Sequence, residues 1–155
     1  MRIESFLKQS PIFQANRMAR RMDAALAEVL KEEELSVFEA LLLAAIFLEK
    51  NGSKKRGGIK PSELAEAFQT TRGNVSHCIS SLEAKGLVQR RIDPDDARAV
   101  QLVLRPQGKK RAVRVVGILD RMQRRIEEGI GVAKLETMLE RMGAVEELCA
   151  GLARR

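Results

Sequence analysis

The stretch IKPSELAEAFQTTRGNVSHCISSLEAKGLVQRRIDPDDARAVQLVL, residues 59–104, decides the fold. Pro61 can begin a short helix, because the N–H that proline lacks would be unpaired in the first turn anyway. Gln69 and Thr70 interrupt the helical pattern, and Thr71 is of a type that caps the start of the next helix. Gly86 suits the left-handed position that often ends a helix. The stretch therefore predicts two helices joined by a tight turn.

The second of these helices, from Thr71 to Lys85, has two different faces. Apolar residues at spacings of three and four predict its buried face, namely Val75, Cys78, Ile79 and Leu82. The opposite side carries small or polar residues, which let a helix backbone approach the major groove of DNA, about 12 Å wide. Donors and acceptors for base edges come from its N-terminal half. The side chains expected to supply them are Arg72, Asn74, Ser76 and His77, and the capping residue Thr71 is also expected to lie at the DNA.

Two strand-like runs, 87–92 and 99–104, flank the loop DPDDAR at 93–98. Arg90, Arg91 and Arg98 cluster around this loop, and arginine suits the negative potential of the minor groove. Asp96 lies two residues from Arg98 and is placed to hold its guanidinium. Arginines on neighbouring strands are equally compatible with ordinary surface charge. Helix, turn, helix and hairpin together are the layout of a winged-helix DNA-binding lobe, here 57–104.

The charge distribution points to the same segment. The net charge is +7, and residues 51–111 carry 13 Lys and Arg against 6 Asp and Glu, while the remainder carries 15 of each sign. Such a localised excess is typical of a protein that binds a polyanion. The predicted second helix and hairpin contain no Phe, and the chain has no Trp or Tyr. Since readers of single strands stack bases on aromatic rings, duplex DNA is favoured over RNA.

The flanking segments predict helices that need a partner. Ser10-Pro11 opens an amphipathic helix, and Ser36 with Glu39 forms a capping box before an almost wholly apolar helix that we expect at the centre of the core. Pro106 starts a long helix, and another follows the break at 129–131. Because the apolar stripes of the terminal helices have no core of their own, a second copy is the simplest partner. We predict a mainly α single domain, 1–155, with dimerisation helices at 11–34 and 106–155.

Several other classes of protein are disfavoured. The longest uncharged apolar run, Ala40–Leu48, has nine residues, whereas a membrane helix needs about 20. With no signal-peptide pattern at the N-terminus, we expect a soluble, cytoplasmic protein without membrane contact. No Gly-rich phosphate loop or nucleophile motif indicates an enzyme, and no cofactor is expected.

The sequence indicates neither a disulfide framework nor a metal site at the two cysteines and the histidine. Cys78 and Cys149 follow no disulfide or metal-binding spacing. Cys78 is predicted to pack in the core, while Cys149 either packs or pairs across a dimer interface. His77 is the single histidine, so an exposed or DNA-facing side chain is favoured over a metal site. The basic loop 51–58, with Lys54, Lys55 and Arg56, is expected to be mobile, and contact with DNA phosphates is the alternative.

The segments PSELAEAF, TTRGNVSHCISSLEAKGLVQRR and DPDDARAV resemble, in type and spacing, the first helix, recognition helix and wing of the MarR family of bacterial transcription regulators. The resemblance covers about residues 11 to 128 and is most specific over 59–108. It implies a homodimer that represses transcription from a palindromic operator, in many members released by a small phenolic or other ligand. It also implies that Arg98 is the wing arginine, supported by Asp96. The residues it places near bases or phosphates are Arg72, Gly73, Asn74, Ser76 and His77.

The chain departs from the family pattern in places. Lys60 stands where Ser or Thr is frequent, and the loop before it is longer than usual. The first long helix has no cysteine of the kind that the peroxide-sensing branch uses, and one histidine is too few for the metal-sensing branch. The alternative function is a winged helix used for sequence-neutral DNA binding or for protein contacts.

Overall fold

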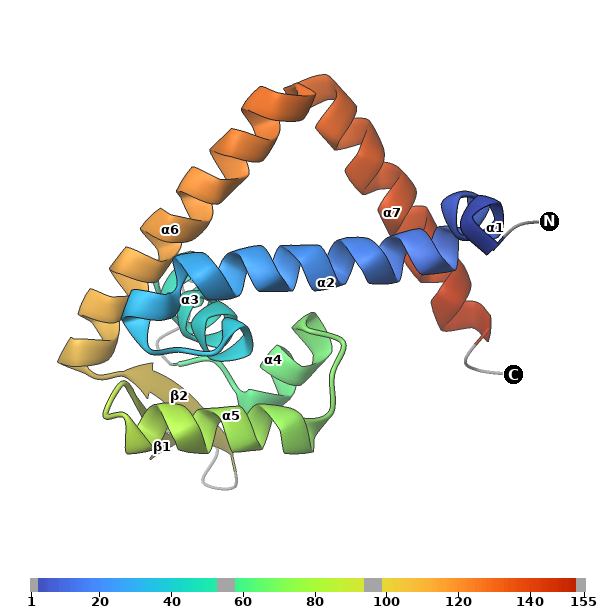
Figure 1. Ribbon diagram of the computed structural model, residues 1–155. Helices are drawn as coiled ribbons and strands as arrows, with labels where there is room; N and C mark the ends of the chain where they lie inside the picture. The colour runs from blue at the N-terminus through green and yellow to red at the C-terminus, as the bar shows by residue number, and fades with distance from the viewer. Residues whose placement is uncertain (1–2, 53–57, 94–98, 153–155) are drawn as a thin grey trace. The chain divides into compact units, whose positions relative to one another are not determined.

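The computed structural model describes residues 3–52, 58–93 and 99–152. Within these ranges the chain is mainly helical with one two-stranded antiparallel sheet, so the predicted fold class is confirmed (Figure 1). Contacts divide it into two compact units, with the boundary between Val116 and Gly117 inside the sixth α-helix. The elements are α1 (Ile3–Gln9), α2 (Pro11–Val29), the 3-10 turn η1 (Lys31–Glu33), α3 (Val37–Gly52), α4 (Pro61–Ala67), α5 (Arg72–Ala84), β1 (Val88–Ile92), β2 (Val100–Leu104), α6 (Pro106–Ile130) and α7 (Val132–Leu152).

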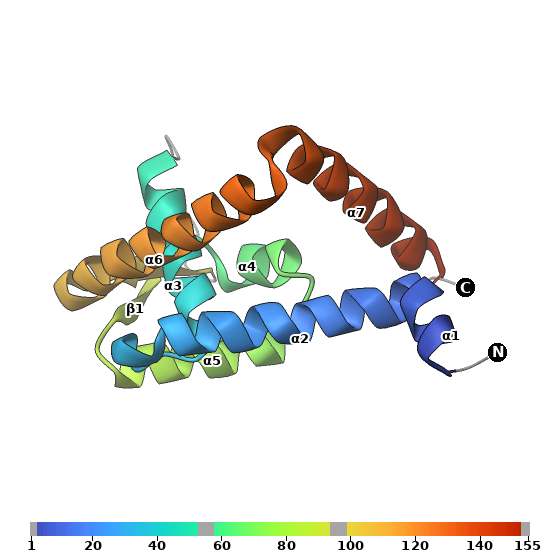
Figure 2. The ribbon, with the colours of Figure 1, turned by 45° about the horizontal axis from the view of Figure 1, so that its top comes forward.

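The core of the first unit is built on α3, as its apolar composition predicts. This helix packs against α2, α5 and β2 and runs across the direction of α5 (Figure 2). Its Leu42 and Leu43 are fully buried, whereas Leu48 near its end is exposed. Fully buried side chains from the other elements complete the core, among them Leu64, Val75, Ile79, Leu82, Val88 and Leu102. Both helices of the predicted helix–turn–helix therefore contribute side chains to this apolar core.

The hairpin forms in the predicted place, with strands starting one residue later than expected. β1 and β2 pair from Val88 opposite Leu104 to Ile92 opposite Val100. Ile59 adds a one-residue bridge to Leu102 on the other edge, where the Leu102 N–H donates to the Ile59 carbonyl over 2.9 Å. At the far end the Asp93 N–H donates to the Ala99 carbonyl over 2.9 Å. The wing tip between them, 94–98, lies outside the described residues.

The first turns of α6 are fastened to the first unit by a buried carboxylate. Glu33 accepts two bonds from the Arg114 guanidinium, at 2.8 and 2.9 Å, while Arg111 donates to the Glu33 carbonyl over 2.6 Å. The bonds from Arg114 outweigh burial and lower the pKa of Glu33 below its usual value of 4.5. One turn earlier, Gly108 is buried against the backbone of Leu87.

Apolar residues remain uncovered on the terminal helices. Among the described residues, none in α1, α2 or α7 is buried. Large exposed side chains occur in both α2 and α7, including Ile12, Phe13, Met22, Leu139, Val145 and Leu148. No helix in the described ranges has both the length and the apolar character that crossing a bilayer requires.

Candidate nucleic-acid interface

The helix–turn–helix is fixed by short-range hydrogen bonds. At the start of α4 the Lys60 N–H donates to the Glu63 carboxylate over 2.8 Å, which is half of a capping box; an ammonium group cannot accept the return bond. In the turn, Gln69 takes a left-handed backbone angle, φ +47°, and the Thr70 N–H reaches the Ala65 carbonyl over 3.0 Å. The predicted turn at Gln69-Thr70 is therefore present.

The predicted cap and buried face of α5 are confirmed. The Thr71 hydroxyl accepts from the Asn74 N–H over 3.1 Å, and Val75, Cys78, Ile79 and Leu82 are all buried. Burial, followed by the charge of Glu39, raises the pKa of the Cys78 thiol to about 11. Spacing alone was enough to find this face, because an amphipathic helix can turn only one side to the core.

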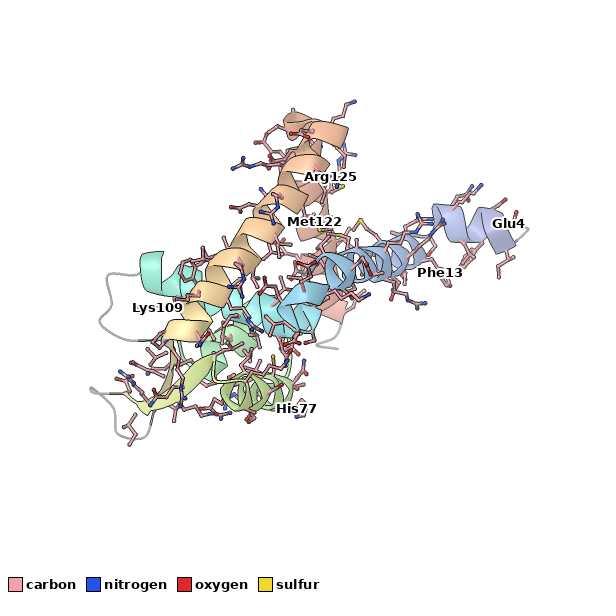
Figure 3. The ribbon with its side chains drawn as sticks, turned by 60° about the vertical axis from the view of Figure 1, so that its left-hand side comes forward. Glu4, Phe13, His77, Lys109, Met122 and Arg125 are labelled. Carbon is pink, nitrogen blue, oxygen red and sulfur yellow. The ribbon has the colours of Figure 1, made fainter. Side chains whose placement is uncertain are left out.

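The structure gathers the sequence-predicted residues of α5 on the opposite, exposed face. His77 lies on the outer side of the helix (Figure 3). Beside Gly73, a Cβ atom would meet only the Thr71 hydroxyl at 3.9 Å, so the surface there is open. The Asn74 amide donates to the Thr70 hydroxyl over 3.0 Å, which orients it while one of its two N–H groups and its oxygen can still serve a base. The exposed set is Thr71, Arg72, Gly73, Asn74, Ser76 and His77.

The wing arginines divide into three cases. Arg91 is exposed on β1. Arg90 instead lies against α5, where its guanidinium donates to the Glu83 carboxylate and, over 3.2 Å each, to the Ser76 carbonyl and the Ser80 hydroxyl. Arg98 and its expected support Asp96 are outside the described residues. Glu83 was not identified from the sequence, because its seven-residue separation from Arg90 spans a helix end and a strand start.

The buried carboxylate of Glu39 joins the C-terminal end of α5 to α3. The predicted capping box is present, since the Ser36 N–H donates to Glu39 over 2.8 Å and the Ser36 hydroxyl accepts from the Glu39 N–H over 3.1 Å. The same carboxylate accepts from the Ser81 hydroxyl over 2.5 Å and from Lys85 over 2.7 Å. Lys85 also donates to the Glu34 carbonyl over 2.9 Å. This second role of Glu39, which fixes where α5 ends, was not predicted from the sequence.

The Glu39 site gives a pH-dependent prediction. Burial disfavours its ionised form, but the bonds from Lys85, Ser81 and Ser36 outweigh burial and lower its pKa below 4.5. A lowered pKa stabilises the fold above about pH 4.5, and this contribution disappears as the pH falls through the folded-state value. Glu39→Gln should therefore lose about 1–3 kcal/mol of unfolding free energy at about pH 7. Urea unfolding should show the gap from wild type closing toward about pH 3; a gap independent of pH would contradict the assignment.

An open, mostly apolar groove lies between α2 and the start of α3, with a volume of about 600 Å³. Ser36, which forms the capping box with Glu39, is also one of the residues that line this groove. Its lining residues are Asp23, Ala24 and Ala27 from α2, then Ser36, Val37, Phe38 and Leu41.

The fold and the exposed face of α5 define a winged helix–turn–helix protein. Residues 54–100 match the model of the MarR family. The transcriptional repressor MprA of Escherichia coli K12 is 36% identical over 70 residues, an alignment that covers 45% of this chain and 38% of MprA. The chain thus matches well under half the length of this curated relative.

Solved structures share the fold over most of the chain. The Staphylococcus aureus MepR–DNA complex superposes with a TM-score of 0.81 at 18% identity, covering 92% of this chain and 98% of MepR. The repressor CouR, bound to a 23-mer DNA duplex, gives 0.73 at 21% identity, covering 90% and 94%. The predicted resemblance to the MarR family is confirmed in sequence over residues 54–100, and the fold is shared with these solved structures over nearly the whole chain.

Proposed function

We propose that this protein is a sequence-specific regulator of transcription, a repressor that binds double-stranded DNA as a homodimer on a palindromic operator. The observation that carries the proposal is the exposed face of α5 from Thr71 to His77, held in place by buried residues on its other side. In each copy α5 enters the major groove and the 93–98 wing lies beside the minor groove. Half-sites then fall about one duplex turn apart, ~34 Å. Such a protein acts in the cytoplasm, where its DNA is.

The similar proteins support this proposal. MprA is named a transcriptional repressor, and both MepR and CouR are described in complex with DNA. The localised positive charge of residues 51–111 adds an independent reason, because charge at the contact surface supplies most of the sequence-neutral part of DNA affinity.

The homodimer is proposed from the uncovered apolar residues of the terminal helices. Leu148 and Leu152 of α7 are 70% and 71% exposed, and Ile12 of α2 is 72% exposed. Patches of this kind mark protein interfaces, and a second copy covers them with one closed, two-fold contact. Light scattering at concentrations that saturate DNA is expected to give the mass of two chains; a single-chain mass would overturn the dimer.

The operator can be found without knowing the regulated genes. Repeated selection from a pool of random duplexes should enrich a palindrome, and the enriched duplex should bind at least ~10³ more tightly than random duplex at physiological salt. A sequence-neutral DNA binder would enrich nothing, and a winged helix used for protein contacts would bind neither duplex. These results separate the alternatives.

Release by a small aromatic or phenolic ligand forms part of the proposal, with the groove beside Ser36 and Phe38 as its site. Its mainly apolar lining and its size suit a small organic molecule. Benzoate and its hydroxylated derivatives are the probes of choice, because a ligand selective for the folded state raises the unfolding temperature. No shift with any of them would remove this ligand class.

Asn74 provides a test of sequence reading. In the Asn74→Ala variant we expect a loss of about 1–3 kcal/mol on the selected duplex and a much smaller loss on random duplex, because an amide reads adenine through a bidentate contact. Competition binding against single-base variants of the duplex locates the position that it reads. Equal losses on selected and random DNA would place Asn74 away from base edges.

A further inference from the structure

The side chain of Arg90 does not extend from the wing into solvent. It crosses to α5 and spans the helix between Glu83 and Ser76, about two turns apart. Glu83 holds both ends of the residue, because its second oxygen also accepts from the Arg90 N–H over 2.9 Å. The Glu83 carboxylate therefore fixes both the backbone of Arg90 near the start of β1 and the guanidinium at the end of its side chain.

The position of Glu83 is unusual for a surface that binds DNA. Its side chain is 29% exposed, on the helix that carries the proposed base-reading face. An unpaired carboxylate there would repel phosphates, and its removal would strengthen binding. If the carboxylate instead positions the Arg90 guanidinium, removing it weakens DNA binding, because the long arginine side chain becomes free and the wing is less rigidly held. The sign of the change on removing the charge therefore separates the two roles.

We propose that Glu83 is a positioning residue for DNA binding: it holds the Arg90 guanidinium on the flank of α5 and so fixes the root of the wing relative to the recognition helix. The inference rests on the proposed function. A helix in one groove and a wing in the next bind DNA more tightly when their separation is fixed beforehand, because loose elements lose conformational entropy on binding. The planar guanidinium carries its donors on separate nitrogens, so that one nitrogen bonds the carboxylate while another bonds the Ser76 carbonyl and the Ser80 hydroxyl.

The test uses the full-length chain and the duplex enriched by selection, at a temperature well below unfolding. Glu83→Gln is expected to weaken binding about tenfold, the size expected when a charged hydrogen bond is lost. The matched control is Glu66→Gln, which removes a carboxylate from an exposed position of α4. That control should bind as wild type or slightly more tightly. Thermal unfolding of each variant shows that the protein measured is folded.

Arg90→Lys supplies a second variant that keeps the charge and removes the fork. It should also lose about tenfold, and adding Glu83→Gln to it should cost little more, because both changes break the same unit. Wild-type or tighter binding by Glu83→Gln, or full additivity of the two changes, would overturn the inference. Failure of the wild-type chain to bind any selected duplex would instead overturn the proposed function, and this inference with it.

Discussion

The His77→Glu variant is expected to lose at least about 100-fold of its affinity for duplex DNA while unfolding at the wild-type temperature. His77 is exposed on the outer side of α5, opposite the buried Val75 and Ile79. In the proposed complex a carboxylate there would lie against phosphates and base edges, in a groove with little room for water or counterions. The fold should not suffer, because glutamate has a better helix propensity than histidine at an exposed helical position.

The matched control is His77→Gln, which has nearly the size of glutamate without its charge. Its loss should be much smaller, so the difference between the two variants isolates electrostatic repulsion. Fluorescence anisotropy with the selected duplex measures both. If the glutamate variant bound within about threefold of wild type, the outer face of α5 would not be the surface that meets DNA.

The second large effect concerns the junction between the wing and α6. Gly108→Ala should destabilise the protein by about 2–3 kcal/mol, although an alanine in place of glycine within a helix ordinarily adds up to about 1 kcal/mol. A Cβ atom at position 108 would lie 1.9 Å from the Leu87 carbonyl oxygen and 2.8 Å from its carbon. That carbonyl already accepts from the Arg105 N–H over 3.0 Å, so it cannot simply move aside.

Gly117→Ala, in the same helix, is the control. The nearest atom to its Cβ would be the flexible tip of Arg121 at 3.5 Å, so the ordinary gain in helix propensity should appear. Urea unfolding of the two variants should then give changes of opposite sign. Equal stability of Gly108→Ala and wild type would mean that the junction between the wing and α6 relaxes without cost.

The parts of the site that obey local rules could be predicted from the sequence. The Thr71 cap and the buried stripe of α5 depend only on residue type and spacing along one helix, and both are present. The Lys85–Glu39 bond joins residues 46 positions apart, and nothing in either local pattern signals it. Arg90 shows the same limit: its place beside the wing was predictable, whereas the direction of its side chain depends on the helix behind it.

The N-terminal helix α1 was missed for a related reason. Seven residues make a helix that is marginal by itself, so its pattern is weak. It is stabilised by contacts with α2, where the rings of Phe6 and Phe13 meet edge to face at 5.7 Å and the Gln14 amide donates to the Leu7 carbonyl over 2.8 Å. The wing-tip pair of Asp96 and Arg98 stays a prediction.

Because Cys78 is buried, the reactivity of its thiol can be used to measure how often α5 separates from the core. Only a thiolate reacts with alkylating agents or peroxide, and a buried thiol with a pKa of about 11 supplies almost none at neutral pH. An alkylating reagent reaches this sulfur only in molecules in which α5 has briefly separated from the core. With the exposed Cys149 replaced by serine, the alkylation rate of the remaining thiol measures how often that happens, and bound operator should slow it.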